Sequence, residues 1–291
     1  MDFAGQTEIG LDHVGLFSAA LEMISAQYEQ LGFCLTPQSQ HANSPGPGLP
    51  AVMRGTANRC AMLKQGYIEL LAVVDPDLDG LGVPDALARY AGMHILAFQT
   101  QDPEHTQTRL QAAGFSAAVA HLQRSVNTPD GSGLARFTQL RTPPEAMPEG
   151  RVFILRHETP ELVWQPAYLS HPNTAVALAE IIVAVDDLAQ AGQRYARYFD
   201  CPAETAAGKA SYVLRQGTFT LMLASALEQA FPQVTIPTLP FPAVLVIDVL
   251  SLETAAQVLI SNNVPFERGA GQLVVAAEFA GGAIMVFHQA G

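Results

Sequence analysis

The stretch LDHVGLF at residues 11–17 decides the fold, because GMHILAF at residues 92–98 repeats its pattern of one histidine inside an apolar strand. A helical segment of similar length follows each stretch, and a Gly-Phe pair follows each helical segment. His13 lies 20 positions before the phenylalanine of its pair, and His94 lies 21 positions before the phenylalanine of the second pair. Matching intervals of this kind indicate a repeated structural unit.

The same unit is expected twice more in the C-terminal half. Apolar strands at 178–185 and 242–249 each precede an amphipathic helix. Glu180 lies 19 positions before Phe199 and takes the place of His13 in the third unit, and Ala243 takes it in the fourth. Further strands are expected after each helix, at 58–64, 67–74, 134–141, 152–157, 210–215, 218–224, 272–277 and 283–288. Each unit therefore reads as βαβββ.

Four such units in two pairs predict an α+β fold of two domains. The Pro- and His-containing segment at 169–173 is the expected link, which places the domains at 9–170 and 174–289. The segment 39–55 is rich in proline and glycine and is expected to be a surface loop over one end of the first sheet. This loop is either part of a lid or a connection without a function of its own.

Composition narrows the class of protein. A chain of 291 residues with 49% hydrophobic and 14% charged residues has ample apolar surface for a buried core. The net charge of −12 argues against binding to nucleic acid or to an anionic membrane. Three scattered cysteines without CxxC spacing, no secretory signal and no long apolar run predict a soluble cytoplasmic protein.

Two histidines and one carboxylate on separate strands point to a metal site. Glu69 interrupts the apolar strand at 67–74, and burial of a carboxylate is costly unless a partner satisfies it. His13, Glu69 and His94 together suit a divalent metal such as Fe, Mn, Ni, Co or Zn. In the alternative, each histidine is a hydrogen-bonded core residue and Glu69 faces solvent while Ile68 and Leu70 pack inward.

The βαβββ repeat, the histidine near the start of the first strand and the stretches at 55–59 and 66–71 resemble the vicinal oxygen chelate superfamily. This group includes glyoxalase I, methylmalonyl-CoA epimerase, extradiol dioxygenases and the fosfomycin and bleomycin resistance proteins. The resemblance implies that each pair of units forms an open, cupped β-barrel with flanking helices and a metal at its base. It assigns His13, Glu69 and His94 as ligands, and His157 either as a fourth ligand or as a group that positions one.

The resemblance treats the two halves differently. The corresponding positions of the second half are Glu180, Thr220, Ala243 and Met285, which make no metal site. We therefore expect that half to be a structural or dimer-forming copy, and the protein to form a homodimer. His288, His41 and His171 are expected at the surface.

Three residues near Glu69 are candidates for substrate binding. Arg59 and Asn58 either bind a carboxylate or carbonyl of a small-molecule substrate or form a surface pair. Tyr67 shares the strand face of Glu69 and is expected to line the cup.

Three functions remain open from the sequence. The first is a metal-dependent, glyoxalase-like lyase or isomerase, in which Glu69 removes a proton and the metal stabilises the resulting enolate. The second is an Fe(II) extradiol-type dioxygenase with the same three ligands. The third is a protein that sequesters a ligand without catalysis, like the bleomycin resistance proteins.

Overall fold

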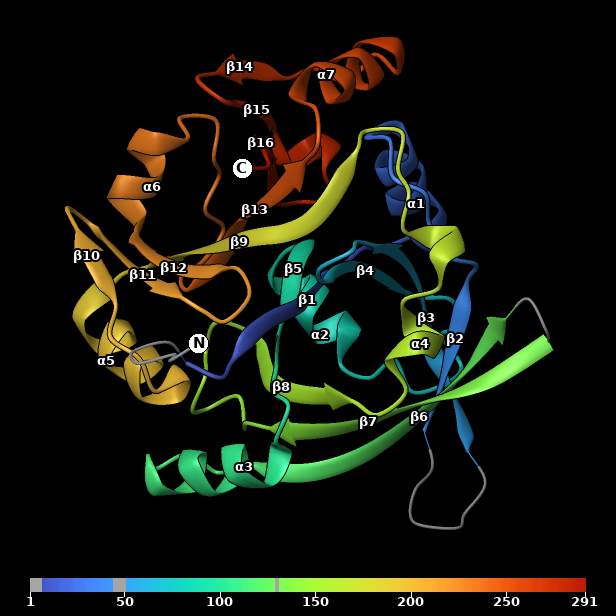
Figure 1. Cartoon of the computed structure of the whole chain (residues 1–291), viewed down its shortest axis with the longest axis vertical. Coiled ribbons are helices and arrows are strands. Elements are labelled where there is room, and N and C mark those ends of the chain that lie inside the picture. The colour runs from blue at the N-terminus through green and yellow to red at the C-terminus, as the bar shows by residue number, and fades with distance from the viewer. Residues whose placement is uncertain (1–6, 44–50, 129–130) are drawn as a thin grey trace.

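The computed structural model describes residues 7–43, 51–128 and 131–291, which form two mixed β-sheets of eight strands each, with helices around them (Figure 1). The N-terminal sheet contains β1 (Gly10–Phe17), β2 (Ser39–Asn43), β3 (Val52–Met62), β4 (Tyr67–Val73), β5 (Gly92–Gln99), β6 (Ala118–Thr128), β7 (Gly131–Arg141) and β8 (Arg151–His157). The C-terminal sheet contains β9 (Ala175–Val185), β10 (Glu204–Ala206), β11 (Lys209–Val213), β12 (Thr218–Leu223), β13 (Phe241–Val249), β14 (Glu267–Gly269), β15 (Gln272–Val275) and β16 (Ile284–Gln289).

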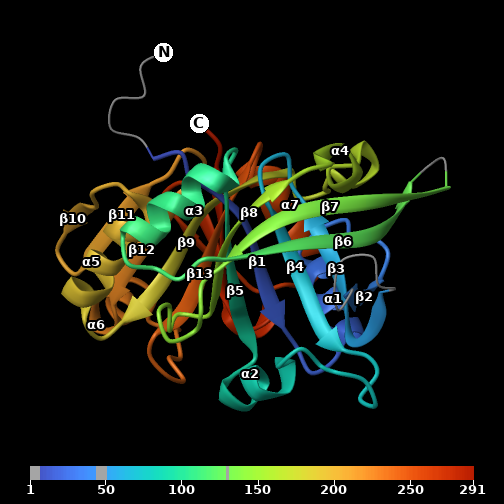
Figure 2. The ribbon, with the colours of Figure 1, turned by 90° about the horizontal axis from the view of Figure 1, so that it is seen from below.

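The described helices lie between or beside these strands. They are α1 (Leu21–Gln30), α2 (Val83–Arg89), α3 (Pro103–Ala112), α4 (Pro160–Val163), α5 (Leu188–Phe199), α6 (Ala224–Ala230) and α7 (Leu252–Ser261), with short 3-10 turns η1 (Pro166–Tyr168) and η2 (Ala277–Phe279). The helices α1, α3, α5 and α7 follow the first strand of each unit, as the sequence predicted. The helices α2 and α6 were not predicted. The helix α2 lies at one end of the N-terminal sheet (Figure 2).

The strand order confirms four βαβββ units in two pairs. The N-terminal sheet runs β2-β3-β4-β1-β5-β8-β7-β6, and the C-terminal sheet repeats this order as β10-β11-β12-β9-β13-β16-β15-β14. Within a unit the first strand lies parallel to the last, as β1 does to β4 and β5 does to β8. Two units join where their first strands pair antiparallel, as β1 does with β5 and β9 with β13.

The expectation of one loop over residues 39–55 is wrong at both ends. Residues 39–43 form β2, which pairs with β3, and β3 already begins at Val52. Strand pairing with β3 satisfies backbone groups that a loop would leave to water. The middle of the segment, residues 44–50, lies outside the described residues.

The N-terminal sheet curls until its edges approach each other (Figure 1). Arg124 on β6 donates from Nη1 to the backbone oxygen of Ala42 on β2, at 3.0 Å. This contact joins the two edge strands, so the sheet is a nearly closed barrel. The C-terminal sheet ends in β10 and β14, which are three residues each.

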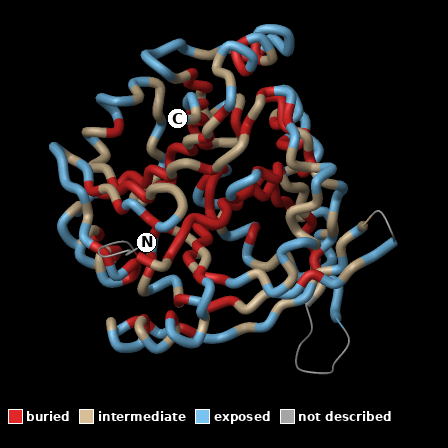
Figure 3. The backbone as a smooth tube through the Cα atoms, viewed as in Figure 1, coloured by how far each residue is buried: buried red, intermediate tan, exposed pale blue. Residues whose placement is uncertain are grey.

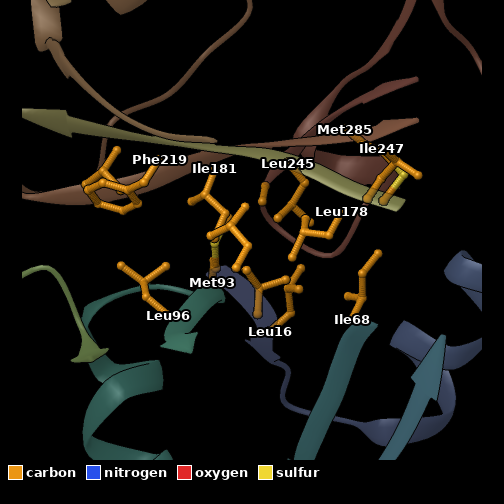
Figure 4. Close-up of a cluster of buried hydrophobic side chains, with 14 of the residues drawn as sticks. Leu16, Ile68, Met93, Leu96, Leu178, Ile181, Phe219, Leu245, Ile247 and Met285 are labelled. Carbon is orange, nitrogen blue, oxygen red and sulfur yellow. The ribbon is translucent and has the colours of Figure 1, made fainter. Parts of the chain in front are cut away.

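One apolar core lies between the two sheets. Buried side chains from β1, β4 and β5 face side chains from β9, β12, β13 and β16 across the middle of the molecule (Figure 4). Burial is greatest along these central strands and falls toward the periphery (Figure 3). The opposite face of each sheet is concave and has its own small apolar cluster. We call these faces the N-terminal cup and the C-terminal cup. Since the sheets share a core, the division into domains 9–170 and 174–289 stays a prediction.

Two β-bulges in the β1–β5 pair position the site residues. Leu11 pairs with Phe98 and His13 with Ala97, so Asp12 is an extra residue on β1. Gly15 pairs with Ile95 and Leu16 with Met93, so His94 is an extra residue on β5. A bulge interrupts the alternation of side chains along a strand, so both residues leave the positions that strict alternation predicts.

Within residues 7–43, 51–128 and 131–291, no helix is both long enough and apolar enough to cross a membrane.

Candidate functional site

A buried carboxylate holds two histidines in the N-terminal cup. Asp12 is fully buried, and its Oδ1 lies 2.5 Å from Nδ1 of His13. Its Oδ2 lies 2.9 Å from Nε2 of His157, which comes from the end of β8. The bulge at Asp12 allows this residue to contact its own neighbour, since adjacent residues of a regular strand point to opposite faces.

The carboxylate of Asp12 determines which nitrogen of each imidazole carries the proton. An ionised carboxylate only accepts hydrogen bonds, so both contacting ring nitrogens must donate. A neutral His13 then presents a basic lone pair at Nε2, and a neutral His157 presents one at Nδ1. The Nδ1 atom of His157 is buried and has no hydrogen-bond partner among the described residues. Asp12 therefore does not occupy either of these two nitrogens.

The ionised form of Asp12 is stable despite its burial. Burial alone would raise the pKa of Asp12, but the charges and hydrogen bonds of His157 and His13 outweigh it and hold the pKa well below its usual range. The carboxylate therefore stays negative at neutral pH.

Glu69 lies in a second network on the same face. Asn58 donates from Nδ2 to Oε1 of Glu69 at 2.5 Å, and Nε2 of His41 lies 3.6 Å from the same oxygen. The side chain is buried, so the alternative in which it faces solvent is wrong. Burial would raise the pKa of Glu69, but His41, the charge of His13 and the Asn58 hydrogen bond lower it to about 2. This carboxylate is a stable anion and a weak base.

Aromatic rings enclose the imidazoles. The Tyr67 ring stacks on His13, with ring centroids 4.3 Å apart and planes at 16°. Phe153 packs edge-on against the same imidazole, with ring centroids 5.7 Å apart. Trp164 packs edge-on against His157, with ring centroids 4.6 Å apart. Tyr67 therefore lines the cup, as the sequence predicted for its strand face. Such rings exclude water and strengthen electrostatic interactions inside the cup.

A cation that the sequence prediction missed also lies near Glu69. Arg124 is close enough to Glu69 and Tyr67 for both to raise its pKa, although burial lowers it more and the net shift is downward. Its guanidinium also closes the barrel through the contact with Ala42. The positive charge of Arg124 therefore interacts electrostatically with the Glu69 carboxylate.

His94 lies apart from this cluster. His13 pairs with Ala97, three residues along β5 from His94, which is roughly 10 Å at the rise of a strand. The His94 ring is stacked between Phe17 and Tyr90, at 5.1 and 4.1 Å, and Nε2 contacts the Tyr90 backbone oxygen at 2.9 Å. The structure therefore gives His94 the surroundings of a hydrogen-bonded core histidine. Burial lowers the pKa of His94 and favours its neutral form.

Three other residues differ from their expected places. Arg59 lies on the other face of β3 from Asn58, and its Nη1 contacts Glu29 on α1 at 2.9 Å. The expectation that His41 and His171 are surface residues is wrong. His41 is buried beside Glu69, and His171 is buried with its Nε2 2.7 Å from the Met62 backbone oxygen.

The predicted metal ligands His13, Glu69, His94 and His157 do not form a metal centre in this structure. Among the described residues, no group of three or more His, Cys, Asp and Glu side chains could hold a metal ion. His13 and His157 share Asp12, Glu69 is held by Asn58 and His41, and His94 is separate. Asp12 nevertheless contacts only one nitrogen of each imidazole, and a carboxylate that orients a histidine is the usual support of a metal ligand.

A family model described as a glyoxalase-like domain matches residues 11–199, which include all of the N-terminal sheet except Gly10 and the start of the C-terminal sheet. No curated protein matches the chain.

Solved structures share the fold at low sequence identity. A hypothetical protein from Staphylococcus aureus has a TM-score of 0.66 and 13% identity, over 97% of this chain and 100% of the other. A mutant of 4-hydroxymandelate synthase from Streptomyces coelicolor has a TM-score of 0.58 and 14% identity, over 98% and 93%. A fusion of a xylose isomerase-like TIM barrel with 4-hydroxyphenylpyruvate dioxygenase has a TM-score of 0.55 and 12% identity, over 98% and 49%.

Proposed function

Because the chain belongs to the glyoxalase-like domain family, we propose that it is a lyase or isomerase acting on a small substrate with adjacent oxygen atoms in the N-terminal cup. The observation that supports this proposal most directly is the buried Asp12 carboxylate that orients His13 and His157.

In the proposed reaction His13 is the base. Asp12 holds the Nδ1–H of His13, so Nε2 takes a proton from the carbon beside a substrate carbonyl, and the electron pair of the broken C–H bond moves to the carbonyl oxygen as an enolate. The negative Asp12 stabilises the imidazolium that forms, as carboxylates do beside catalytic histidines. The proton is then returned to a neighbouring carbon, or the enolate expels a leaving group.

Glu69 has a different role in this proposal from the one that the sequence suggested. A carboxylate with a pKa of about 2 is a poor base near neutral pH, because it binds protons weakly. We assign it to holding Asn58 in place through their hydrogen bond and to stabilising the positive charge of Arg124, so that both side chains are available to the oxygen-bearing part of the substrate. Tyr67 covers one side of His13 and limits the access of water.

We also propose, from the sequence resemblance alone, that the protein binds a divalent metal (Fe, Mn, Ni, Co or Zn). His13 and His157 would hold it through their available nitrogens, and it would polarise substrate oxygens. The described side chains do not form a complete donor set, and the reaction above does not depend on one.

The test measures deuterium uptake by hydroxyacetone and by pyruvate in D₂O, followed by proton NMR. We expect the wild-type protein to accelerate exchange and Asp12→Asn to lower the rate by about 100-fold, because general-base catalysis contributes roughly that factor. Asp85→Asn, which removes an exposed carboxylate on α2, is the matched control and should leave the rate unchanged. Equal rates in the wild type and Asp12→Asn would rule out the His13–Asp12 pair as the base.

The same assay separates the alternatives. If EDTA leaves the exchange rate unchanged, His13 and Asp12 are sufficient to remove the proton without a metal. A rate that EDTA abolishes and one of the five metals restores assigns the free imidazole nitrogens to that metal. Consumption of dissolved oxygen with added Fe(II) would favour the dioxygenase instead. The homodimer and the cytoplasmic location stay predictions from the sequence.

A further inference from the structure

A cavity of about 450 Å³ opens in the C-terminal cup, on the side of the sheet away from the shared core. Cavities of this volume accommodate small organic molecules. The cavity does not include His13, Asp12 or Glu69, so it is separate from the cluster in the N-terminal cup. The sequence prediction treated this half as a structural copy and gave it no ligand.

A row of polar side chains crosses one end of the cavity. Thr218 on β12 pairs with Glu180 on β9. On the neighbouring strands, Asp248 on β13 pairs with His288 on β16, and His288 pairs with Gln272 on β15. These polar residues on five neighbouring strands give one end of the cavity a polar lining.

The carboxylate of Glu180 is held in place by hydroxyl groups. Thr220 donates to Oε1 of Glu180 at 2.5 Å, and the Thr220 hydroxyl lies 2.8 Å from that of Ser211. Because a hydroxyl has one proton, Ser211 donates to Thr220 while Thr220 donates to Glu180. This chain fixes the carboxylate and leaves Oε2 for another donor.

The second carboxylate has a histidine as its hydrogen-bond partner. Asp248 Oδ1 lies 2.9 Å from Nδ1 of His288, its direct neighbour on β16. Val246 pairs with Glu180, so Asp248 is the diagonal neighbour of Glu180, at roughly 7–8 Å between backbones. None of the described residues that line the cavity is Lys or Arg. The cavity therefore has a negative end without a cationic side chain to balance Glu180.

The remainder of the lining is largely apolar. Ile182, Val246, Val286 and Phe231 line the cavity and belong to, or pack against, the buried cluster that forms the floor of the C-terminal cup. An apolar floor next to a negative rim favours a ligand with an apolar body and a positively charged end.

We propose that the C-terminal cup binds a small organic cation, an amine on an apolar or aromatic body. Its ammonium group lies between Glu180 and Asp248, and its body lies over Val246, Val286 and Phe231. This site is independent of the reaction proposed for the N-terminal cup.

The test uses three probes of similar shape, benzylamine, benzyl alcohol and benzoate, each titrated into the full-length protein by isothermal calorimetry. We expect benzylamine to bind at least about 10-fold more tightly than benzyl alcohol, and benzoate to bind most weakly, because only the amine is attracted by the carboxylates. Glu180→Gln should lower benzylamine affinity by about 10-fold and leave benzyl alcohol unchanged. Asp248→Asn should act in the same direction if Glu180→Gln fails to fold.

Two controls locate the site. Glu267→Gln removes an exposed carboxylate on β14 that does not line the cavity and should leave all three affinities unchanged. Glu69→Gln should also leave benzylamine binding unchanged. The proposal is overturned if benzylamine fails to bind at millimolar concentration, if benzyl alcohol binds equally well, or if Glu69→Gln abolishes binding while folded Glu180→Gln and Asp248→Asn retain it.

Discussion

The two buried carboxylates of the N-terminal cup depend on different partners. Asp12 is held by two histidines, and Glu69 by an amide and His41. Both have a lowered pKa, because these partners outweigh the cost of burial. Each therefore links the stability of the fold to the protonation of one side chain.

The first prediction concerns Glu69 and acid stability. Its pKa is about 2 in the folded protein and 4.5 without the surroundings of the fold, so ionised Glu69 stabilises the fold above pH 4.5. As the pH falls from 4.5 toward 2, the unfolded chain binds the proton first and this stabilisation, about 3 kcal/mol, is lost. Glu69→Gln should therefore lower the free energy of unfolding at pH 6 and flatten its fall between pH 5 and pH 2.

Urea unfolding at several pH values measures this change. Glu267→Gln, at an exposed position of β14, is the control that should follow the wild type. An unchanged slope for Glu69→Gln would show that its carboxylate is not held as the structure places it.

The sequence identified part of the candidate site and missed the rest for reasons of geometry. The repeat pointed to His13, and the apolar strand around Glu69 pointed to a buried carboxylate. Asp12 was missed because adjacent residues of a strand are expected on opposite faces, which a bulge changes. Arg124 was missed because nothing in its polar strand shows that the sheet curls until β6 reaches β2.

At the scale of elements, the tight turn between β3 and β4 supports the Asp12 bulge. Gly66 in this turn has a φ of +77°, a conformation that favours glycine. A Cβ atom at Gly66 would lie 2.7 Å from the backbone oxygen of Asp12. The close approach of the turn therefore requires a residue without a side chain.

The second prediction compares two glycines with similar backbone conformations. Gly66→Ala should lower the free energy of unfolding by about 2–4 kcal/mol, because it adds a clash with Asp12 to the strain of a positive φ. Gly271→Ala, in the β14–β15 turn, has a φ of +75° and no atom within 4 Å of the new Cβ, so it should cost only about 1 kcal/mol. Equal losses in the two variants would contradict the close packing of the turn on Asp12. Urea unfolding measures both.

The order of the elements could be predicted because the strand-and-helix pattern repeats four times along the chain. The edge strands of the two sheets could not be predicted. The predicted strands at 67–74 and 152–157 match β4 and β8. Each has a run of apolar residues, which is buried in β4 and mostly buried in β8. In contrast, β6 alternates between exposed and half-buried positions, and β10 and β14 are exposed and three residues long. Such segments have no apolar run that distinguishes them from loops.

At the scale of the whole molecule, the shared core predicts cooperative unfolding. Leu245 on β13 is fully buried in the cluster that contains Leu16 and Leu96 of the N-terminal sheet. Its truncation to alanine should lower the free energy of unfolding by about 2–5 kcal/mol. Because the two sheets share this core, the loss should reach both sheets.

The third prediction uses Trp164, which is the only tryptophan and lies beside His157. Leu245→Ala should shift the urea midpoint of Trp164 fluorescence and that of far-ultraviolet circular dichroism by the same amount. An unshifted fluorescence midpoint would show that the two halves unfold independently. Met23→Ala, at an exposed position of α1, is the control that should leave both midpoints near the wild type.

The aromatic rings around His94 contact both the N-terminal cup and the C-terminal cup. Phe17 belongs to the apolar cluster of the N-terminal cup, Tyr90 and Phe241 belong to that of the C-terminal cup, and His94 lies between Phe17 and Tyr90. These four rings therefore connect the apolar clusters of the two cups, although none of them lines the C-terminal cavity. Loss of one of these rings is therefore expected to loosen the packing of both clusters at the point where the two halves of the chain meet.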